Sequence, residues 1–155
     1  TTDNKKVDWT SADENIARVA KNGVVTARKV EGVQEVTITA TAQDGSGASA
    51  IQTITVRPEV TAITLLRDGQ PLEPKAAIQL NIGAGETSLQ LAAQVDSSDA
   101  IQKVNWKSSN DRVATVDENG LVTVLRNGRV DITATAADGS RKRAVCALTI
   151  VKSAD

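Results

Sequence analysis

The chain contains the same motif twice, separated by the length of a small domain. The two copies occupy residues 7–27 and 104–124 and read VDWTSADENIARVAKNGVVTA and VNWKSSNDRVATVDENGLVTV. Trp9 matches Trp106 at an offset of 97 residues, and the Asn-Gly pair near the end of each copy matches at the same offset. Self-similarity at a fixed spacing is typical of modular arrays. We therefore expect homologous modules in tandem.

A second pair of matching segments follows the motif at a smaller offset. VTITATAQDGS at residues 36–46 matches VDITATAADGS at residues 130–140, and the offset here is 94. The first copy has therefore gained three residues between Thr26 and Ile38. Extra length costs little entropy in a surface loop, so we expect the insertion in a loop around Lys29–Glu35.

Most of the chain alternates between apolar and polar residues. From Val130 to Ala136 the apolar side chains alternate with Asp and Thr, which is the period of a strand with one buried face. Asn-Gly and Asp-Gly pairs separate such stretches and favour tight hairpin turns. This pattern predicts an all-β fold built from β-sandwiches. The strands expected in the second copy are Val60–Leu66, Ile78–Ile82, Ser88–Val95, Gln102–Lys107, Val113–Asp117, Leu121–Arg126, Val130–Ala137 and Arg143–Val151.

Charge and aromatic content exclude several classes of partner. The 18 Lys and Arg residues nearly balance the 19 Asp and Glu residues, so no general field attracts nucleic acid or an anionic membrane surface. Trp9 and Trp106 are the only aromatic residues, which leaves bases almost nothing to stack on. No apolar run approaches the roughly 20 residues of a membrane helix. We expect no nucleic-acid partner and no direct membrane insertion.

Groups that carry catalysis are scarce in this sequence. The absence of His removes the commonest general base and zinc ligand. There is no Gly-rich phosphate loop with Lys and no Asp-x-Asp-x-Asp-Gly calcium loop. The single cysteine, Cys146, lies in an alternating strand and matches Gln52 of the first copy, so we interpret it as a small buried apolar residue. We expect no catalytic residue, no cofactor and no metal ion, and therefore no enzyme.

Three clusters of polar residues leave alternatives open. Asp13-Glu14 and Asn110-Asp111 follow the tryptophan strand in each copy, and they are either solvated turn residues or ligands of a surface calcium. Asp117 and Glu118 resemble a hydrolytic carboxylate pair, but nothing in the sequence places a partner across a cleft. Residues 141–143 form a basic hairpin tip, which is either a solvated turn or a contact for an anionic wall polymer or glycan.

Each module is expected to pack around its single tryptophan. A lone Trp in the middle of a β-sandwich sequence typically fills the core between the sheets. We interpret both tryptophans as core residues and not as ligand platforms. The predicted structural core contains Trp9, Val19 and Ile38 in the first copy and Trp106, Val116 and Ile132 in the second.

The ordered motifs resemble the bacterial immunoglobulin-like domain, group 2. The resemblance rests on Trp-x-Ser, Ala-x-Val, Asn-Gly followed by an apolar residue and Val-Thr, and a Thr-rich strand before a Gly turn. It implies tandem immunoglobulin-like β-sandwiches. The matching positions are Trp9, Ser11, Ala17, Val19, Asn22–Thr26 and Thr37–Thr41, and then Trp106, Ser108, Ala114, Val116, Asn119–Thr123 and Thr133–Thr135.

The resemblance also implies a setting and a role. Modules of this family occur in tandem in bacterial surface and secreted proteins, including adhesins, cell-wall proteins, phage virion proteins and extracellular polysaccharide-degrading enzymes. Most serve as non-catalytic spacers or adhesive units. We therefore expect an extracellular or cell-surface stalk or spacer with a possible part in adhesion; the alternative is an accessory carbohydrate-binding module of an extracellular polysaccharide-degrading enzyme. Its partners would be neighbouring Ig-like modules, and candidate ligands are a cell-wall polymer, a glycan or a host surface protein.

The two copies differ in what precedes the tryptophan. Val60–Asn105, 46 residues, precedes Trp106, whereas eight residues precede Trp9. The first copy is therefore 38 residues shorter. We expect residues 1–57 to be a module that lacks its opening strands, either incomplete or completed by strands of another chain through β-augmentation. Residues 58–155 are expected to be a complete module.

The connection between the copies is short. Val56–Val60 contains one proline and no Gly-Ser run, a composition that favours a stiff link. We therefore expect the two modules to join end to end in an extended rod, which suits a stalk.

Overall fold

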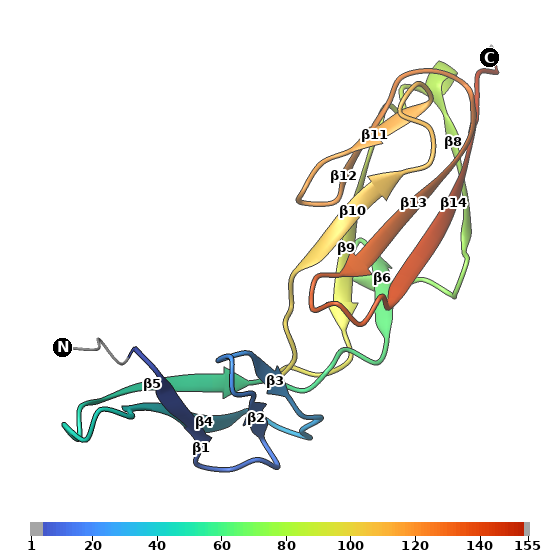
Figure 1. The fold of residues 1–155 in the computed structure, drawn as a ribbon. Coiled ribbons are helices and arrows are strands. Elements are labelled where there is room, and N and C mark those ends of the chain that lie inside the picture. Colours follow the sequence, from blue (N-terminus) through green and yellow to red (C-terminus); the bar gives the residue numbers. More distant parts are fainter. Residues whose placement is uncertain (1–4, 154–155) are drawn as a thin grey trace. The chain divides into compact units, whose positions relative to one another are not determined.

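The computed structural model describes residues 5–153. The chain divides into two compact units, with the division between Glu59 and Val60. We call the units unit 1, before this point, and unit 2, after it (Figure 1). The boundary predicted from the sequence, between residues 57 and 58, lies two residues earlier.

Unit 2 contains two β-sheets. In the first sheet the order is β10-β13-β14-β8, with β8 parallel to β14 and the other pairs antiparallel. In the second sheet the order is β11-β12-β9-β6-β7. The strands are β6 (Ile63–Arg67), β7 (Gln70–Pro71), β8 (Ala77–Asn81), β9 (Ser88–Val95), β10 (Val104–Ser108), β11 (Ala114–Val116), β12 (Leu121–Val124), β13 (Gly128–Ala136) and β14 (Arg143–Val151), with a 3-10 turn, η1 (Ile82–Ala84), between β8 and β9.

All eight strands predicted for this copy are present, and only the two-residue β7 was missed. Alternation explains their burial, because every second residue of β9 and β13 faces the space between the sheets. Each buried Leu, Ile or Val side chain there contributes about 1.5–3 kcal/mol through removal from water. The buried cluster comprises Leu65, Ile78, Leu80, Leu89, Leu91, Val113, Ala114, Val122, Val124, Val130, Ile132, Ala134, Cys146, Leu148 and Ile150.

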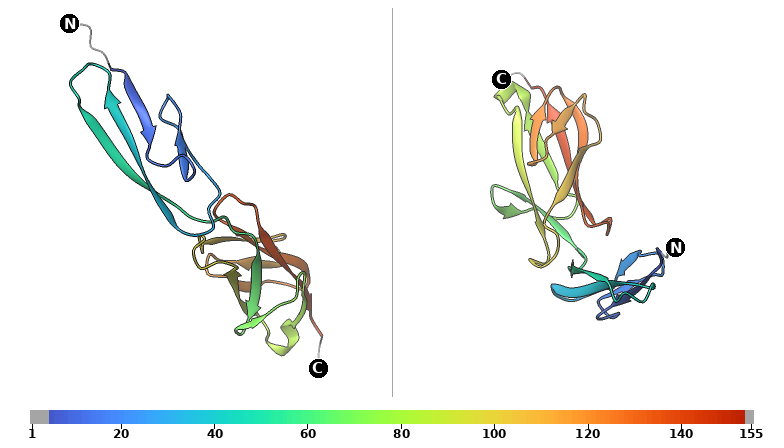
Figure 2. Two further views of the ribbon diagram at one scale, coloured as in Figure 1. Left: turned by 90° about the horizontal axis from the view of Figure 1, so that it is seen from below. Right: turned by 60° about the vertical axis from the view of Figure 1, so that its left-hand side comes forward.

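Unit 1 repeats five of these strands. Its three-stranded sheet has the order β1-β4-β5, and β2 pairs with β3 in a separate hairpin (Figures 1 and 2). The registers match those of unit 2, since Trp9 lies opposite Ala40 as Trp106 lies opposite Ala134. The strands are β1 (Val7–Ser11), β2 (Ala17–Val19), β3 (Val25–Ala27), β4 (Gln34–Ala42) and β5 (Ser49–Val56).

The three inserted residues lie where the sequence placed them. The loop between β3 and β4 spans residues 28–33, whereas the equivalent loop between β12 and β13 spans residues 125–127. The strands on both sides keep their registers, because a loop absorbs added length without shifting the ladder. The insertion predicted around Lys29–Glu35 is therefore confirmed.

The described part of unit 1 has no counterparts of β6, β7, β8 and β9. Its buried apolar cluster is correspondingly small, with Ala17, Val36 and Val56 fully buried and Ile16, Val30 and Ile54 packed against them. The all-β fold class is confirmed, and no α-helix occurs within residues 5–153. Accordingly, that range contains no helix with the length and apolarity required to cross a membrane.

Candidate functional site

The residues predicted to form the core lie at two depths. Ile38 and Ile132 are buried, the latter completely. The two tryptophans and the two valines beside them, Val19 and Val116, are only partly buried. Trp106 and Val116 pack against the large apolar cluster of unit 2. Trp106 therefore packs on the core of unit 2 while part of the residue faces solvent, and Trp9 is partly buried in unit 1.

This position follows from the place of the tryptophan strand in its sheet. β1 and β10 lie at the edges of their sheets. Each carries its Trp on the face of the sheet that is directed toward the Asn-Gly turn of the hairpin β2-β3 or β11-β12. The sandwich is open at this edge, so a large ring there is only partly covered by protein. The sequence predicted a core residue at each position, and alternation alone does not distinguish an edge strand from a central one.

The Asn-Gly turn closes against the indole in both units. Gly23 and Gly120 adopt φ of 84° and 81°, a left-handed conformation that favours glycine. A Cβ added to either glycine would lie 2.8 Å from Cζ2 of the Trp ring of its unit. The recurring glycine is thus required twice over, by backbone conformation and by ring contact.

Local hydrogen bonds hold this turn and the strand that leads to it. The Ser108 hydroxyl donates to the Ala114 carbonyl at 2.6 Å, and Ser11 donates equivalently to Ala17 at 2.7 Å. In unit 2, Asp117 Oδ1 accepts from the backbone N–H groups of Asn119 and Leu121, both at 2.9 Å. The Ser of the Trp-x-Ser motif therefore ties the tryptophan strand to the opposite sheet.

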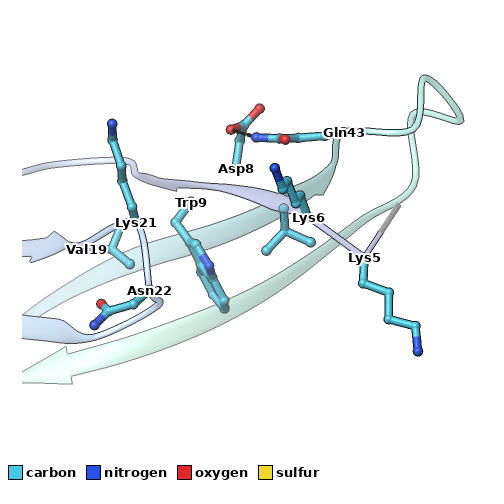
Figure 3. A pocket seen from close by; sticks show the side chains of 9 residues that line it. Lys5, Lys6, Asp8, Trp9, Val19, Lys21, Asn22 and Gln43 are labelled. Carbon is cyan, nitrogen blue, oxygen red and sulfur yellow. Dashed lines mark hydrogen bonds between the residues drawn. The ribbon is translucent and has the colours of Figure 1, made fainter. Parts of the chain in front are cut away.

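A groove opens beside the tryptophan in each unit, and we call these the Trp9 groove and the Trp106 groove. Their volumes are about 590 and 530 Å³. Figure 3 shows the Trp9 groove, with Val19 and Asn22 on one side of the indole and Lys6 on the other. The Trp9 groove is lined by Lys5, Lys6, Val7, Asp8, Trp9, Val19, Lys21, Asn22 and Gln43, and the Trp106 groove by Gln102, Lys103, Val104, Asn105, Trp106, Val116, Asp117, Glu118 and Asn119.

The two grooves share a shape and differ in charge. The Trp9 groove carries three lysines and one carboxylate, Asp8, which accepts a hydrogen bond of 2.5 Å from Gln43 Nε2 (Figure 3). The Trp106 groove carries two carboxylates and one lysine. Amide side chains occur in both. The geometry therefore repeats while the electrostatic character is reversed.

Two of the residues considered as calcium ligands, Asp13 and Asn110, serve as turn caps. Asp13 Oδ1 accepts from the Asn15 N–H at 2.8 Å, and Asn110 Oδ1 accepts from the Arg112 N–H at 3.1 Å. Within residues 5–153, no three His, Cys, Asp or Glu side chains converge as a metal site requires. These caps are the local hydrogen bonds typical of Asx turns.

The carboxylates of Asp117 and Glu118 are consecutive residues of one turn. Asp117 uses one oxygen for two backbone N–H groups, as a structural cap does. Glycoside hydrolysis requires two carboxyl groups that face each other across a scissile bond. Neighbouring residues of one turn do not supply that arrangement.

Asp138 links the turn before β14 to the start of unit 2. Its Oδ2 accepts from the Val60 N–H at 2.7 Å and its Oδ1 accepts from the Ser140 N–H at 2.9 Å. Burial tends to raise the pKa of Asp138, but these hydrogen bonds and that of the Ser140 side chain lower it below the ordinary value. In the basic hairpin tip, Arg141 takes a positive φ of 63°, as turn residues do.

The Cys146 thiol is completely buried, as predicted. Burial raises its pKa, which favours the unreactive thiol over the thiolate. It belongs to the same buried cluster as Ile132, its partner in β13, and Leu148. Cys146 therefore acts as a small apolar side chain.

The fold is that of tandem immunoglobulin-like sandwich modules, and the sequence profile of the family described as bacterial Ig-like domain (group 2) matches residues 1–53 and 80–146. The chain belongs to this family. Each of the two matched segments contains one copy of the repeated motif. The resemblance inferred from the Trp-x-Ser and Asn-Gly motifs is thus confirmed, and the matched family is an Ig-like module and not a catalytic domain.

Several curated proteins are similar over part of their length. An uncharacterized protein of Clostridium acetobutylicum is 35% identical over 92% of this chain, which spans 13% of that protein. An Ig-like virion protein of Serratia phage KSP90 is 34% identical over 94% of this chain, which spans 53% of it. Lacto-N-biosidase of Bifidobacterium bifidum is 42% identical over 56% of this chain, which spans 7% of the enzyme. The chain thus spans well under two thirds of the relatives it matches.

Solved structures with similar folds are more distant in sequence. The surface-layer protein SbsC matches 98% of this chain at 15% identity and a TM-score of 0.42, and the chain covers 21% of it. The C-terminal fragment of intimin, solved with the intimin-binding domain of its translocated receptor, matches 96% of this chain at 18% identity and a TM-score of 0.40, and the chain covers 52% of it.

Proposed function

We propose that the chain is a non-catalytic spacer segment of an extracellular or surface-displayed bacterial or phage protein. The observation that carries this proposal is the repetition of one Ig-like module within a single chain, with the same registers around Trp9 and Trp106. Repeated modules of one fold add length without adding chemistry. The family match and the similarity to a phage virion protein support the same setting.

The connection between the modules supports a stalk. Val56 and Val60 are both buried, and only Arg57, Pro58 and Glu59 lie between them. A proline in so short a connection restricts the backbone. In a stalk of this kind the partners are neighbouring Ig-like modules of the parent protein, and adhesion would come from contact with a cell-wall polymer, a glycan or a host surface protein.

Small-angle X-ray scattering of the full chain tests the spacer role. Strands of up to nine residues make each unit roughly 40 Å long with its loops, so an end-to-end rod has a maximum dimension of roughly 80 Å. Replacement of Arg57-Pro58-Glu59 by Gly-Ser-Gly should broaden the distance distribution and shorten the average. A wild-type maximum dimension of roughly 50 Å, or no response to the replacement, contradicts the stalk.

A second candidate function is glycan binding at the two tryptophan grooves. The specific observation in its favour is that each tryptophan is partly exposed and lines a groove with amide side chains, the residue types that recognise sugars by stacking and hydrogen bonds. The similarity of part of the chain to lacto-N-biosidase agrees with a carbohydrate setting.

Titration with a panel of oligosaccharides, followed by tryptophan fluorescence, distinguishes the two candidates. Glycan binding predicts a saturable shift that the double variant Gln102→Ala/Asn105→Ala weakens, whereas Gln79→Ala on the distant β8 leaves it unchanged. A spacer without a glycan site gives no saturable shift with any sugar. The scattering result does not depend on this outcome.

A further inference from the structure

The two tryptophan grooves are formed by matched positions of the repeat. At the offset of 97 residues, every residue that lines the Trp106 groove matches a position within 5–9 or 19–22 of unit 1. The Trp9 groove is lined from these same two stretches, with Gln43 as its one further described residue. The two grooves are therefore the same site of the module with different side chains.

The groove does not depend on the chain that precedes the tryptophan strand. In unit 2 the loop of residues 96–103 precedes β10 and is described in full. The Trp106 groove nevertheless opens there, and its lining begins at Gln102, the match of Lys5. The groove is thus a property of the strand and of the Asn-Gly turn beside it.

The two grooves differ most at one matched position, where the charge is reversed. Lys21 of the Trp9 groove matches Glu118 of the Trp106 groove, and Lys5 matches the neutral Gln102. The three lysines and one carboxylate of the Trp9 groove give it a net charge of +2. The one lysine and two carboxylates of the Trp106 groove give it a net charge of −1. The same site therefore attracts ligands of opposite charge in the two units.

The Lys21 side chain is available to a ligand. It is exposed, and its ammonium group forms no ion pair or hydrogen bond with the other residues that the structure describes. Figure 3 shows Lys21 and Lys6 on opposite sides of Trp9. A lysine carries its charge on a flexible four-carbon stem, so it reaches a ligand that lies over the ring. A ligand above the indole would therefore have a cation on either side.

The one carboxylate of the Trp9 groove is engaged by an amide. Asp8 Oδ1 accepts a hydrogen bond of 2.5 Å from Gln43 Nε2 (Figure 3). The bond joins the tryptophan strand to the residue that follows β4, at the side of the groove. Asp8 therefore helps to build the groove wall, and the lysines still outnumber it three to one.

The partly exposed indole of Trp9 provides a surface that a sugar ring can cover. Its ring lies against the turn, since a Cβ added to Gly23 would lie 2.8 Å from Cζ2. An aromatic ring that is already held in place loses little conformational entropy when a ligand stacks on it. Asn22 lines the groove beside the ring and offers an amide to hydroxyl groups (Figure 3). Stacking would fix the sugar, and the lysines would then meet its charged substituents.

We propose that the Trp9 groove binds a saccharide that carries carboxylate groups, and that Lys21 determines this preference. The ligand class is an oligosaccharide of uronic acid residues. In the Trp106 groove Glu118 repels the same ligand, so that groove is left to neutral or amino sugars. This inference rests on the second candidate function, glycan binding at the tryptophan grooves.

Nuclear magnetic resonance of the full, nitrogen-15-labelled chain tests the proposal with trigalacturonic acid as the probe. Trp9 and Trp106 are the two tryptophans of the chain, so each groove has its own indole N–H signal, which Trp9→Phe assigns. We expect a saturable shift of the Trp9 signal and little change of the Trp106 signal. The methyl ester of the same trisaccharide keeps the rings but loses the charges, and it should bind roughly tenfold more weakly at low salt.

Salt gives a second measure of the same preference. Exposed charges are screened over about 10 Å at 0.1 M salt and over about 3 Å at 1 M salt. The affinities of the acid and of its methyl ester should therefore converge as the salt concentration rises. A difference between them that salt does not reduce would contradict selection by Lys21.

Matched charge reversals separate a selective groove from a general electrostatic attraction. Lys21→Glu replaces an attraction by a repulsion and should weaken trigalacturonic acid binding roughly tenfold at low salt. Glu118→Lys should produce a saturable shift of the Trp106 signal, a gain that a folding defect does not explain. Lys29→Glu makes the same change in the loop between β3 and β4, outside the groove lining, and should leave the affinity unchanged.

Three results overturn the proposal, and they differ in what they leave standing. Equal affinity for trigalacturonic acid and its methyl ester, or no effect of Lys21→Glu, removes the charge preference but keeps glycan binding as a candidate function. The same Trp9 shift with a short polyglutamate shows that the groove collects anions without recognising a sugar. No shift of either indole with any neutral or acidic saccharide rejects glycan binding together with the proposal. None of these results bears on the scattering test of the spacer role.

Discussion

Val25 and Val122 occupy the same place in the repeat and the same register in their hairpins, yet Val122 is completely buried and Val25 is 36% exposed. The same contrast separates Ile54 from Leu148 and Gly23 from Gly120. In each pair the unit 2 residue lies directly beside a residue of β8 or β9, as a strand partner or through a backbone hydrogen bond. The comparison teaches that a local motif is sufficient for a strand pair, whereas burial depends on strands from a distant part of the chain.

The largest difference between the two units is expected in the stability lost when a core isoleucine is replaced by alanine. Ile132→Ala should destabilise unit 2 by about 3–4 kcal/mol, because a cavity in a closed core cannot collapse. Ile38→Ala should destabilise unit 1 by about 1–2 kcal/mol, because the buried cluster of this unit is small and its interior can relax. Hydrogen exchange with mass spectrometry during urea unfolding reports each unit separately. Equal losses in the two units would contradict the comparison.

The next largest difference is expected in the stability lost when the turn glycines are replaced by alanine. In Gly120→Ala the alanine would have to adopt the left-handed backbone conformation of the glycine, and its Cβ would lie against both Trp106 and the Leu91 carbonyl. We therefore expect the free energy of unfolding of unit 2 to fall by about 3 kcal/mol. In Gly23→Ala the three atoms nearest the new Cβ all belong to the Trp9 ring, and the substitution should cost about 1–2 kcal/mol. Gly139, with nothing within 4 Å, provides the control for backbone strain alone. A Gly23→Ala loss as large as that of Gly120→Ala would show that the ring contact dominates.

The matched serines should show a smaller difference. Ser108→Ala leaves the Ala114 carbonyl without its side-chain donor in a buried setting and should destabilise unit 2 by about 1–2 kcal/mol. Ser11→Ala removes the same bond in a partly buried setting and should cost less than about 1 kcal/mol. Urea midpoints of both variants measure the difference. Indistinguishable shifts would mean that solvent reaches both bonds equally.

The smallest expected effect is a dependence of the stability of unit 2 on pH in the acidic range. Hydrogen bonds lower the pKa of Asp138 below its ordinary value of 3.8, so the folded state binds fewer protons than the unfolded state there. This contribution is present above pH 3.8 and disappears as the pH falls through the lower pKa of the folded state. Asp138→Asn should therefore flatten the acid limb of the urea midpoint plotted against pH.

The matched carboxylate in unit 1 gives the control for this measurement. Asp44 accepts a hydrogen bond from the Ser46 N–H at 2.9 Å, and the side-chain and backbone hydrogen bonds from Ser46 lower the pKa of Asp44. Its match in unit 2 accepts an additional bond from Val60, for which unit 1 has no counterpart among its described residues. Asp44→Asn should therefore leave the urea midpoint of unit 2 unchanged across the acidic range. A flattened unit 2 limb in this variant would contradict the assignment to Asp138.

Much of the fold was predictable because its signals are local. Alternation located every strand longer than two residues in unit 2, and the change of offset located the inserted loop between β3 and β4. The Gln70–Pro71 strand was missed because two residues carry no period. The grooves were missed for a different reason, since Trp106 has the same neighbours in sequence whether β10 lies at the edge or in the centre of its sheet.

By itself, the sequence determined the strand positions, the tandem repeat, the burial of Cys146 and the family of the chain. Those properties depend on side-chain period and on turn residues such as Asn22-Gly23, which act over a few neighbours. Only the tertiary structure decided that β8 runs parallel to β14, that Asp138 holds the start of unit 2, and that each tryptophan borders a groove. These features join residues as much as 78 positions apart, and such contacts form through packing that no local pattern encodes.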